Sequence, residues 1–292
     1  MTGAGAGSWP VPPLFTRFVD DTSLLRPKAT APGVGGVVGR YLEARDGRLG
    51  EVVGQLVCPV SRLPELVAEL ARWAPSQPVD LALVVDTGLG AVPKALSTAL
   101  SRATLLTPRT VETPAPPDVD AMWLERVSEF VPEDVLPVVE PRRPTDADPD
   151  STAAWLGAVR RVAAHGCAPK LRCGGPRVSD VPSLSEVEAF LRVAAEAGRG
   201  CTVLGLRALV RTESHPRGPQ HGILNLVVAV ARVITGGDVR GALLTTDGAV
   251  LAAEVKLLSD HSVGEVRGLL ARCGADPEPV PITQLAELGL LA

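Results

Sequence analysis

Short apolar runs alternate with segments of helical periodicity along most of the chain, beginning near residue 54. The runs are continuously apolar, which is typical of parallel strands covered by helices on both faces. Between them, apolar residues recur at the spacing of one helix face. The runs that we predict to be strands are 55–60, 79–85, 104–112, 135–139, 167–171, 201–204 and 241–245.

Several of the predicted helices begin at recognisable capping residues. Ser61 precedes the first helix, and Ser183 with Glu186 forms a capping box for a later one. Ser262 with Glu265 has the same spacing and predicts the start of the last helix. These capping residues predict that a helix follows the runs 55–60, 167–171 and 241–245.

Seven or eight strand–helix units in succession predict a (β/α)8 barrel, with an open doubly wound sheet as the alternative. The segment 14–25 is apolar around Asp20 and Asp21 and is a candidate first strand or a short helix. No domain break interrupts the units, so we expect residues 14–292 to form one barrel domain. Residues 1–13 are rich in small residues and proline and predict a flexible N-terminal segment.

In a barrel of this kind the functional site lies at the carboxyl ends of the strands. The polar residues at or after the predicted strand ends include three carboxylates, then cations, then a histidine and an amide. They are Asp86, Glu112, Glu140, Lys170, Arg172, Arg207, His221 and Asn225. His215 also lies nearby, but its polar surroundings predict a solvated loop residue.

Lys170 is the most informative of these residues. The chain has only four lysines, at 28, 94, 170 and 256, and uses arginine elsewhere. An amine among apolar strands can lose its proton, whereas a guanidinium cannot, so Lys170 is a candidate base or Schiff-base nucleophile. If 14–25 contains the first strand, Lys170 lies on the sixth, which resembles its placement in class I aldolases.

The residues around Lys170 suggest how an anionic substrate could be held. Arg172 lies on the same face of the predicted strand, and Gly174 and Gly175 follow with backbone amides that could contact phosphate or carboxylate. Arg207 could complete an anion clamp. In this interpretation Glu112 and Glu140 transfer protons, while His221 and Asn225 orient the substrate and Asp86 contributes to binding. Alternatively, Lys170, Arg172 and the two glycine amides bind the anion, and His221 is the catalytic acid–base group.

Two other interpretations of the same residues remain open. Three carboxylates at successive strand ends could bind Mg²⁺ with Lys170 as the base, as in the enolase superfamily, although that family's N-terminal capping domain is not apparent. The chain could also be a non-catalytic barrel that binds a ligand or a protein partner. Convergence of Lys170, Glu112 and Glu140 in one pocket would favour an enzyme. We otherwise predict no metal and no cofactor.

Composition narrows the function classes further. The chain has 292 residues, is 46% hydrophobic and has a net charge of −4 with a pI near 5.7, which argues against a nucleic-acid surface. The longest apolar run is too short to span a bilayer, and no signal peptide is apparent. Five cysteines without C-x-x-C spacing predict reduced thiols and a cytoplasmic location. The low charge is compatible with a homodimer.

Several short motifs resemble a family of bacterial proteins, common in actinobacteria, without an assigned reaction. Its members carry K-[LV]-R-T-G-G and H-G-F-L-N, which match Lys-Leu-Arg-Cys-Gly-Gly at 170–175 and His-Gly-Ile-Leu-Asn at 221–225. Early acids at 19–21, the segment 58–63 and the C-terminal 285–291 also match. The resemblance implies a barrel fold over most of the chain.

The chain departs from that family at positions that bear on chemistry. The family's paired histidines correspond to Arg207 and Ala208, and the threonine of its Gly-Gly loop corresponds to Cys173. If the paired histidines serve acid–base or metal chemistry in the family, this chain has lost or changed that chemistry. The substitution motivates the non-catalytic alternative.

Overall fold

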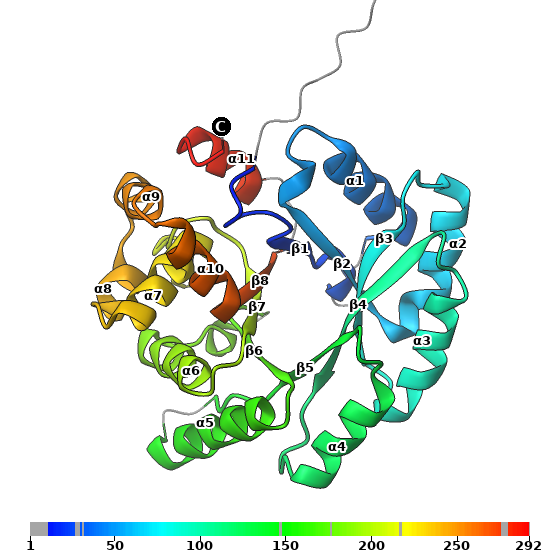
Figure 1. Cartoon of the computed structure of the whole chain (residues 1–292), viewed down its shortest axis with the longest axis horizontal. Helices are drawn as coiled ribbons and strands as arrows, with labels where there is room; N and C mark the ends of the chain where they lie inside the picture. Colours follow the sequence, from blue (N-terminus) through cyan, green and yellow to red (C-terminus); the bar gives the residue numbers. More distant parts are fainter. Residues whose placement is uncertain are drawn as a thin grey trace, which may run out of the picture.

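Eight parallel strands close into a barrel in the computed structural model, and helices surround it (Figure 1). The structure describes residues 11–26, 30, 32–145, 148–175, 177–215, 218–275 and 280–291. Each strand pairs with the next along the chain, and β8 pairs with β1. The predicted (β/α)8 barrel is therefore confirmed. Of the predicted flexible segment 1–13, residues 1–10 lie outside the described residues, and Val11 packs into the core.

The strands are β1 Val19–Asp21, β2 Val53–Pro59, β3 Val79–Val84, β4 Leu106–Pro114, β5 Leu136–Glu140, β6 Ala168–Arg172, β7 Cys201–Leu206 and β8 Leu270–Ala275. The helices are α1 Val34–Asp46, α2 Leu63–Trp73, α3 Val92–Leu100, α4 Ala121–Phe130, α5 Pro149–Ala164, α6 Leu184–Glu196, α7 Ile223–Thr235, α8 Val239–Leu244, α9 Gly248–Lys256, α10 Asp260–Leu269 and α11 Val280–Glu287. Short 3-10 turns are η1 Ser23–Leu25, η2 Gly50–Val52, η3 Val60–Arg62, η4 Leu89–Ala91 and η5 Val178–Asp180. The first strand does lie within segment 14–25, so Lys170 is on the sixth.

The end of the chain differs from the sequence-based prediction. The run 241–245, predicted to be a strand, belongs to helix α8, because Asp238 caps that helix by accepting from the amide of Gly241 at 2.9 Å. The eighth strand is instead Leu270–Ala275, whose Arg272 interrupts the apolar pattern. A short apolar run alone does not distinguish a strand from a buried helix.

The helix starts are confirmed in one case and shifted in two. Ser183 and Glu186 form the predicted capping box of α6. Helix α10 begins after Ser259, which accepts from the amide of Ser262, so Ser262 is not the cap. Ser61 does not cap α2 either, because its amide and hydroxyl donate to the carboxylate of Asp86.

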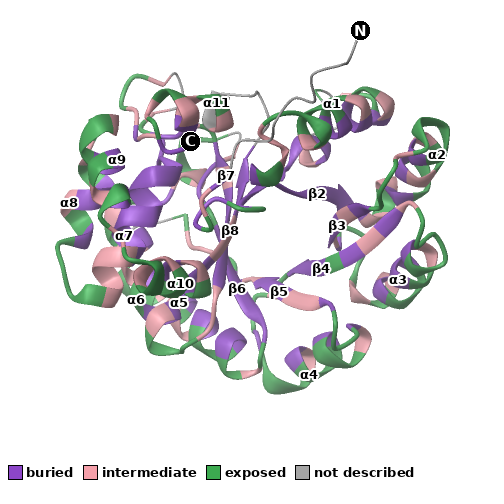
Figure 2. Ribbon diagram, turned by 45° about the horizontal axis from the view of Figure 1, so that its top comes forward, coloured by how far each residue is buried: buried purple, intermediate pink, exposed green. Residues whose placement is uncertain are grey.

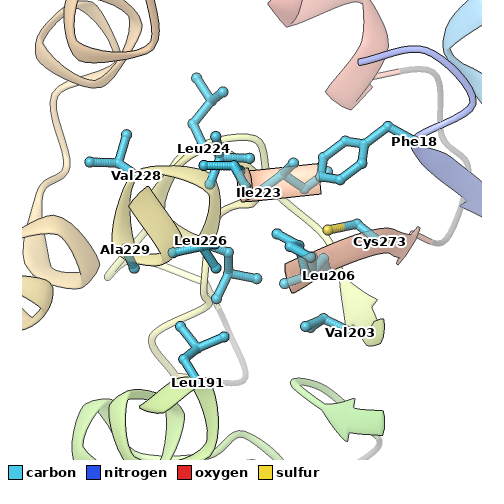
Figure 3. Close-up of a cluster of buried hydrophobic side chains, with 14 of the residues drawn as sticks. Phe18, Leu191, Val203, Leu206, Ile223, Leu224, Leu226, Val228, Ala229 and Cys273 are labelled. Atoms are coloured by element: carbon cyan, nitrogen blue, oxygen red, sulfur yellow. The ribbon is translucent and has the colours of Figure 1, made fainter. Parts of the chain in front are cut away.

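The main core lies between the barrel and its helices (Figure 2). Helix α7 is buried over most of its length and packs against β7 and β8, where its aliphatic side chains gather with Phe18, Leu206 and Cys273 (Figure 3). Four helices, α7 to α10, separate β7 from β8, and α8 and α9 pack against α7. The apolar run in α7 is thus the centre of a helical layer. No helix in the described residues is long and apolar enough to cross a membrane.

Candidate functional site

The interior of the barrel is polar at its centre. Most barrels fill this space with layers of branched aliphatic side chains. Here β1, β2, β4, β6, β7 and β8 contribute polar side chains to it. These are Asp20, Gln55, Thr110, Glu112, Lys170, Thr202 and Arg272. All but Arg272 are buried, and the Arg272 side chain is 18% exposed.

Contacts between strands that are not neighbours show that these side chains point inward. Lys170 on β6 contacts Glu112 on β4, with β5 between them. Thr202 is in register with both Lys170 and Arg272, so the three side chains lie on the same face of β6, β7 and β8. The strand register therefore places a row of polar groups along one wall of the interior.

The Lys170–Glu112 pair is the most deeply buried ion pair among the described residues. Nζ of Lys170 donates to Oε2 of Glu112, and the two side chains are 3% and 8% exposed. Burying two charges costs several kcal/mol of solvation each, in order of magnitude, which their attraction repays only with good geometry. A pair of this kind is therefore weak evidence for stability alone.

A second interior network adjoins this pair. Arg272 Nε lies 3.2 Å from Oδ2 of Asp20, whose Oδ1 accepts from the backbone amide of Gln55 at 2.7 Å. With its amide oriented to satisfy its neighbours, Gln55 accepts from Arg272 Nε at 2.9 Å and donates to Thr110 Oγ1 at 2.8 Å. The network joins β1, β2, β4 and β8 across the barrel.

Asp20 is the group in this network that titrates near neutrality. Burial raises the pKa of its carboxyl to about 7, and the nearby Glu112 charge raises it further. Arg272, the Gln55 amide and Lys170 act in the opposite direction without cancelling the effect of burial. A carboxyl with this pKa can both donate and accept a proton at neutral pH.

Thr202 has an unsatisfied hydroxyl beside Lys170. The residue is 4% exposed, and its Oγ1 has no hydrogen-bond partner among the described residues. Buried polar atoms are nearly always paired, so an unpaired one needs an explanation such as a bound ligand or water. Thr202 is in register with Lys170, so its hydroxyl lies where it could form a hydrogen bond with an oxygen atom held near the Lys170 amine.

Glu140 and Arg172 form a separate pair at the carboxyl ends of β5 and β6. Arg172 Nε and Nη2 donate to the two Glu140 oxygens at 2.7 and 2.8 Å, in a bidentate arrangement. Burial raises the pKa of Glu140, but the charges of Arg172 and Lys170 outweigh it, so the pKa lies below its ordinary value. Burial lowers the pKa of Arg172, yet Glu140 outweighs that and raises it overall. The pair is therefore ionised and lies near Lys170.

The glycines after β6 allow two strand ends to approach closely. A Cβ on Gly174 would collide with the carbonyl oxygen of Gly205, which itself has φ +83°. A Cβ on Gly175 would collide with the Asp180 carboxylate. Both positions therefore require glycine for packing, at the end of the strand that carries Lys170.

Arg207 and Asp86 lie at the barrel mouth. Arg207 follows β7, is exposed, and has no carboxylate within ion-pair distance among the described residues. Asp86 is exposed after β3, where it holds Ser61 of the preceding turn. Arg207 is thus a cation available to a ligand, whereas Asp86 has a partner within the chain.

His221 and Asn225 are buried in contacts outside the Lys170 cluster. His221 Nε2 donates to the carbonyl of Pro182 at 2.7 Å, its Nδ1 has no partner among the described residues, and burial lowers its pKa. Asn225 accepts from the amide of Arg211 at 2.7 Å and donates to the carbonyls of Ala242 and Thr245. These contacts fasten the β7–α7 loop and α8 to helix α7.

The three carboxylates predicted as alternative Mg²⁺ ligands have separate partners. Asp86 accepts from Ser61, Glu112 pairs with Lys170, and Glu140 pairs with Arg172. In the part of the chain that the structure describes, no three His, Cys, Asp or Glu side chains are grouped as metal ligands. The structure thus brings Lys170, Glu112, Glu140 and Arg172 together without forming a carboxylate cluster.

Five interior residues were not singled out from the sequence as site residues: Asp20, Gln55, Thr110, Thr202 and Arg272. Asp20 had a weak signal, as an acid within an apolar segment. Gln55 and Thr110 lie inside strands, where a polar side chain facing the interior looks like an ordinary exposed position. Arg272 lies on the strand that the sequence did not predict.

The sequence matches no protein-family model and no curated protein sequence. Among solved structures, the chain is similar to one described as "QR15, an Aldolase", with 10% sequence identity and a TM-score of 0.47. The similarity covers 95% of this chain and 96% of that one.

Proposed function

We propose that this protein is a barrel enzyme of lyase, aldolase or isomerase type that acts on a small anionic or carbonyl metabolite without a metal. The observation that carries the proposal is the buried contact between Lys170 and Glu112. Lys170 would be the base or the Schiff-base nucleophile. A buried amine beside a carboxylate has a proton acceptor within reach.

In the Schiff-base form of the reaction, the Lys170 ammonium first transfers a proton to Glu112. The neutral amine then attacks the substrate's carbonyl carbon, and loss of water from the adduct gives the imine. Asp20, with its pKa of about 7, is suited to move protons to and from the substrate during these steps. The Thr202 hydroxyl would donate to the substrate oxygen nearest the amine.

The barrel mouth would bind the anionic part of the substrate. Arg207 is exposed there with no carboxylate partner among the described residues, and Arg172 is held in place by Glu140. Glu140, predicted from the sequence to transfer protons, is reassigned here to orienting Arg172, and proton transfer is assigned to Glu112 and Asp20. His221 and Asn225 would act by fixing the loop that follows Arg207, since their contacts are with backbone groups.

The non-catalytic alternative has one observation in its favour. Lys170 is 3% exposed and already paired, as expected of a purely structural ion pair. The two proposals differ in what they predict for added metabolites. The Mg²⁺-dependent alternative would require Glu112 and Glu140 to leave their cationic partners, and added Mg²⁺ tests it directly.

Thermal melting against a panel of carbonyl, carboxylated and phosphorylated metabolites, with and without Mg²⁺, tests the proposal. A ligand at 100 times its dissociation constant stabilises the folded state by about 2.7 kcal/mol. We expect a shift in the wild type that is lost in Lys170→Met/Glu112→Gln, a variant that removes both charges together. No shift with any compound would contradict the enzyme proposal and favour a non-catalytic barrel that binds a protein partner.

A further inference from the structure

A groove lies on the outside of the barrel, away from the Lys170 site. It has a volume of about 580 Å³ and lies between the N-terminal segment 12–15, the end of α9, helix α10 and the chain after α11. Figure 1 shows the N-terminal segment beside α11. Its walls are mainly apolar, formed by Leu14, Phe15, Val255, Leu258, Val263 and Leu290. Small-molecule sites have this size and composition when a few polar groups accompany the apolar walls.

Arg267 provides such a polar group, as a guanidinium without a carboxylate partner among the described residues. Its Nη1 donates to the carbonyl of Leu14 at 3.3 Å, and its Cζ lies 4.7 Å from the centre of the Phe18 ring. No carboxylate among the described residues lies within ion-pair distance of it. A guanidinium has five N–H donors, and among the described residues one hydrogen bond is made by this group, to Leu14.

The rest of the charge around the groove is also biased toward cations. Lys256 lines it, and its Nζ donates to the carbonyl of Leu288 at 3.2 Å, again without a carboxylate partner in the described chain. Asp260 is the acid among the described lining residues, and it is exposed at the start of α10. Burial lowers the pKa of Arg267, as expected for a cation that lacks a compensating anion.

We propose that this groove binds a small amphipathic carboxylate, whose carboxylate pairs with Arg267 and Lys256 and whose apolar body lies on Leu14, Val263 and Leu290. The two cations select a negative head group. The apolar walls select a chain or ring over a small hydrophilic anion. The site is independent of the barrel interior and goes beyond the proposed reaction.

Two glycines of α10 provide a matched pair of variants for the test. Gly264 lines the groove, whereas Gly268 lies one turn further along the same helix and does not line it. A Cβ added at either glycine meets nothing within 4 Å. The backbone therefore tolerates a side chain at either position, and we expect leucine at 264 to fill the groove and Gly268→Leu to leave it open.

Isothermal titration calorimetry of the full chain with decanoate, decan-1-ol and acetate tests the proposal. Decan-1-ol lacks the carboxylate, and acetate lacks the apolar body, so both should bind more weakly than decanoate. We expect decanoate to bind wild type and Gly268→Leu equally, while binding is lost in Gly264→Leu. Removing the charge of the ligand or of the protein should weaken binding about ten-fold or more. We therefore expect weaker binding of decan-1-ol to the wild type, and weaker binding of decanoate to Arg267→Gln. Lys170→Arg should bind decanoate as the wild type does.

Three results would overturn the proposal. One is no decanoate binding to the wild type, and another is equal binding of decanoate and decan-1-ol. The third is undiminished decanoate binding by Gly264→Leu. If Arg267→Gln fails to fold because the Leu14 contact is lost, the comparison of Gly264→Leu with Gly268→Leu and of decanoate with decan-1-ol still tests the proposed site.

Discussion

Four ionisable side chains meet in the barrel interior, and their charges sum to zero only above the Asp20 pKa of about 7. Asp20 and Glu112 are the acids, and Lys170 and Arg272 are the bases. Each charge is stabilised mainly by the others, because water is largely excluded from the interior. Removing one member therefore leaves an uncompensated charge, whereas removing an opposed pair does not.

Replacement of Lys170 alone should destabilise the fold strongly. We expect Lys170→Met to lower the free energy of unfolding by about 3–5 kcal/mol, because Glu112 is left as a buried unpaired carboxylate. The double variant Lys170→Met/Glu112→Gln should recover more than half of that loss. Lys94→Met, at an exposed lysine on α3, should change stability by no more than about 0.5 kcal/mol. Urea unfolding of the four proteins measures these differences, and equal losses in the single and double variants would contradict the pairing.

Asp20 should give the protein a distinctive dependence of stability on pH. Its pKa is about 7 in the folded state and 3.8 as an ordinary carboxyl, so the folded state binds its proton more tightly. The resulting stabilisation is present at low pH and is lost as pH rises through about 7. The difference in unfolding free energy between wild type and Asp20→Asn should therefore fall by roughly 3 kcal/mol between about pH 5 and pH 8.

The difference in unfolding free energy between wild type and Asp20→Asn cancels the contributions of the other titrating groups, which both proteins contain. His221 is the main example, since its lowered pKa makes stability fall below about pH 6.5, in the opposite direction. Urea unfolding at several pH values gives the difference directly. A wild-type advantage that stays constant or grows as pH rises would show that the Asp20 carboxyl is not protonated preferentially in the folded state.

Single residues were predictable from the sequence where they stand at strand ends. Lys170, Glu112, Glu140 and Arg172 follow apolar runs, and the parallel sheet brings such ends to one edge. The specific pairing, Lys170 with Glu112 and Arg172 with Glu140, depends on side-chain direction and on strands that are distant in sequence. Local pattern carries no information about those contacts.

At the level of elements, the β7–β8 connection stands out. Helix α7 starts at Ile223, directly after the loop that carries Arg207, and its Asn225 ties that loop to α8. This amide makes three hydrogen bonds to backbone groups, one at Arg211 in the loop and two at Ala242 and Thr245 at the end of α8. Asn225, in the first turn of α7, is therefore one of the contacts that hold this loop at the barrel mouth, beside the backbone bonds of Ile223 and Leu224.

Asn225→Ala should be costly for that reason. We expect a loss of roughly 3 kcal/mol or more, because buried backbone groups at Arg211 and Ala242 and a partly buried one at Thr245 lose their partner. Thr235→Ala, at the exposed end of the same helix, should cost at most about 0.5 kcal/mol. Chemical unfolding compares the two, and hydrogen exchange should show faster opening of the β7–α7 loop in Asn225→Ala. Similar stabilities for both variants would argue against this role.

Elements were predictable where propensity and pattern agreed, as in the strands β2 to β7. The last strand was missed because Leu270–Ala275 carries Arg272 and Gly274, which weaken its apolar pattern. That arginine is tolerated within the barrel because Asp20 and Gln55 bind it. Arg272, which interrupts the apolar pattern of β8, is thus a member of the interior hydrogen-bond network.

For the whole molecule, barrel closure creates the interior network. The pairing of β1 with β8 brings Asp20 next to Arg272, although 252 residues separate them in the chain. The barrel and its parallel order were predictable from the repeating units, although the eighth strand was predicted at 241–245 and lies at Leu270–Ala275. Which polar residues meet inside depends on the register of all eight strands, which no local sequence signal determines.

The central claim, that Lys170 is a reactive amine in the barrel interior, is tested most directly by reductive trapping. The protein would be incubated with carbonyl metabolites and cyanoborohydride, and the adduct located by peptide mass mapping. The account predicts an adduct on Lys170, little on the exposed Lys94 and Lys256, and none at position 170 in Lys170→Arg. Labelling of the exposed lysines with Lys170 left unmodified would contradict the Schiff-base role.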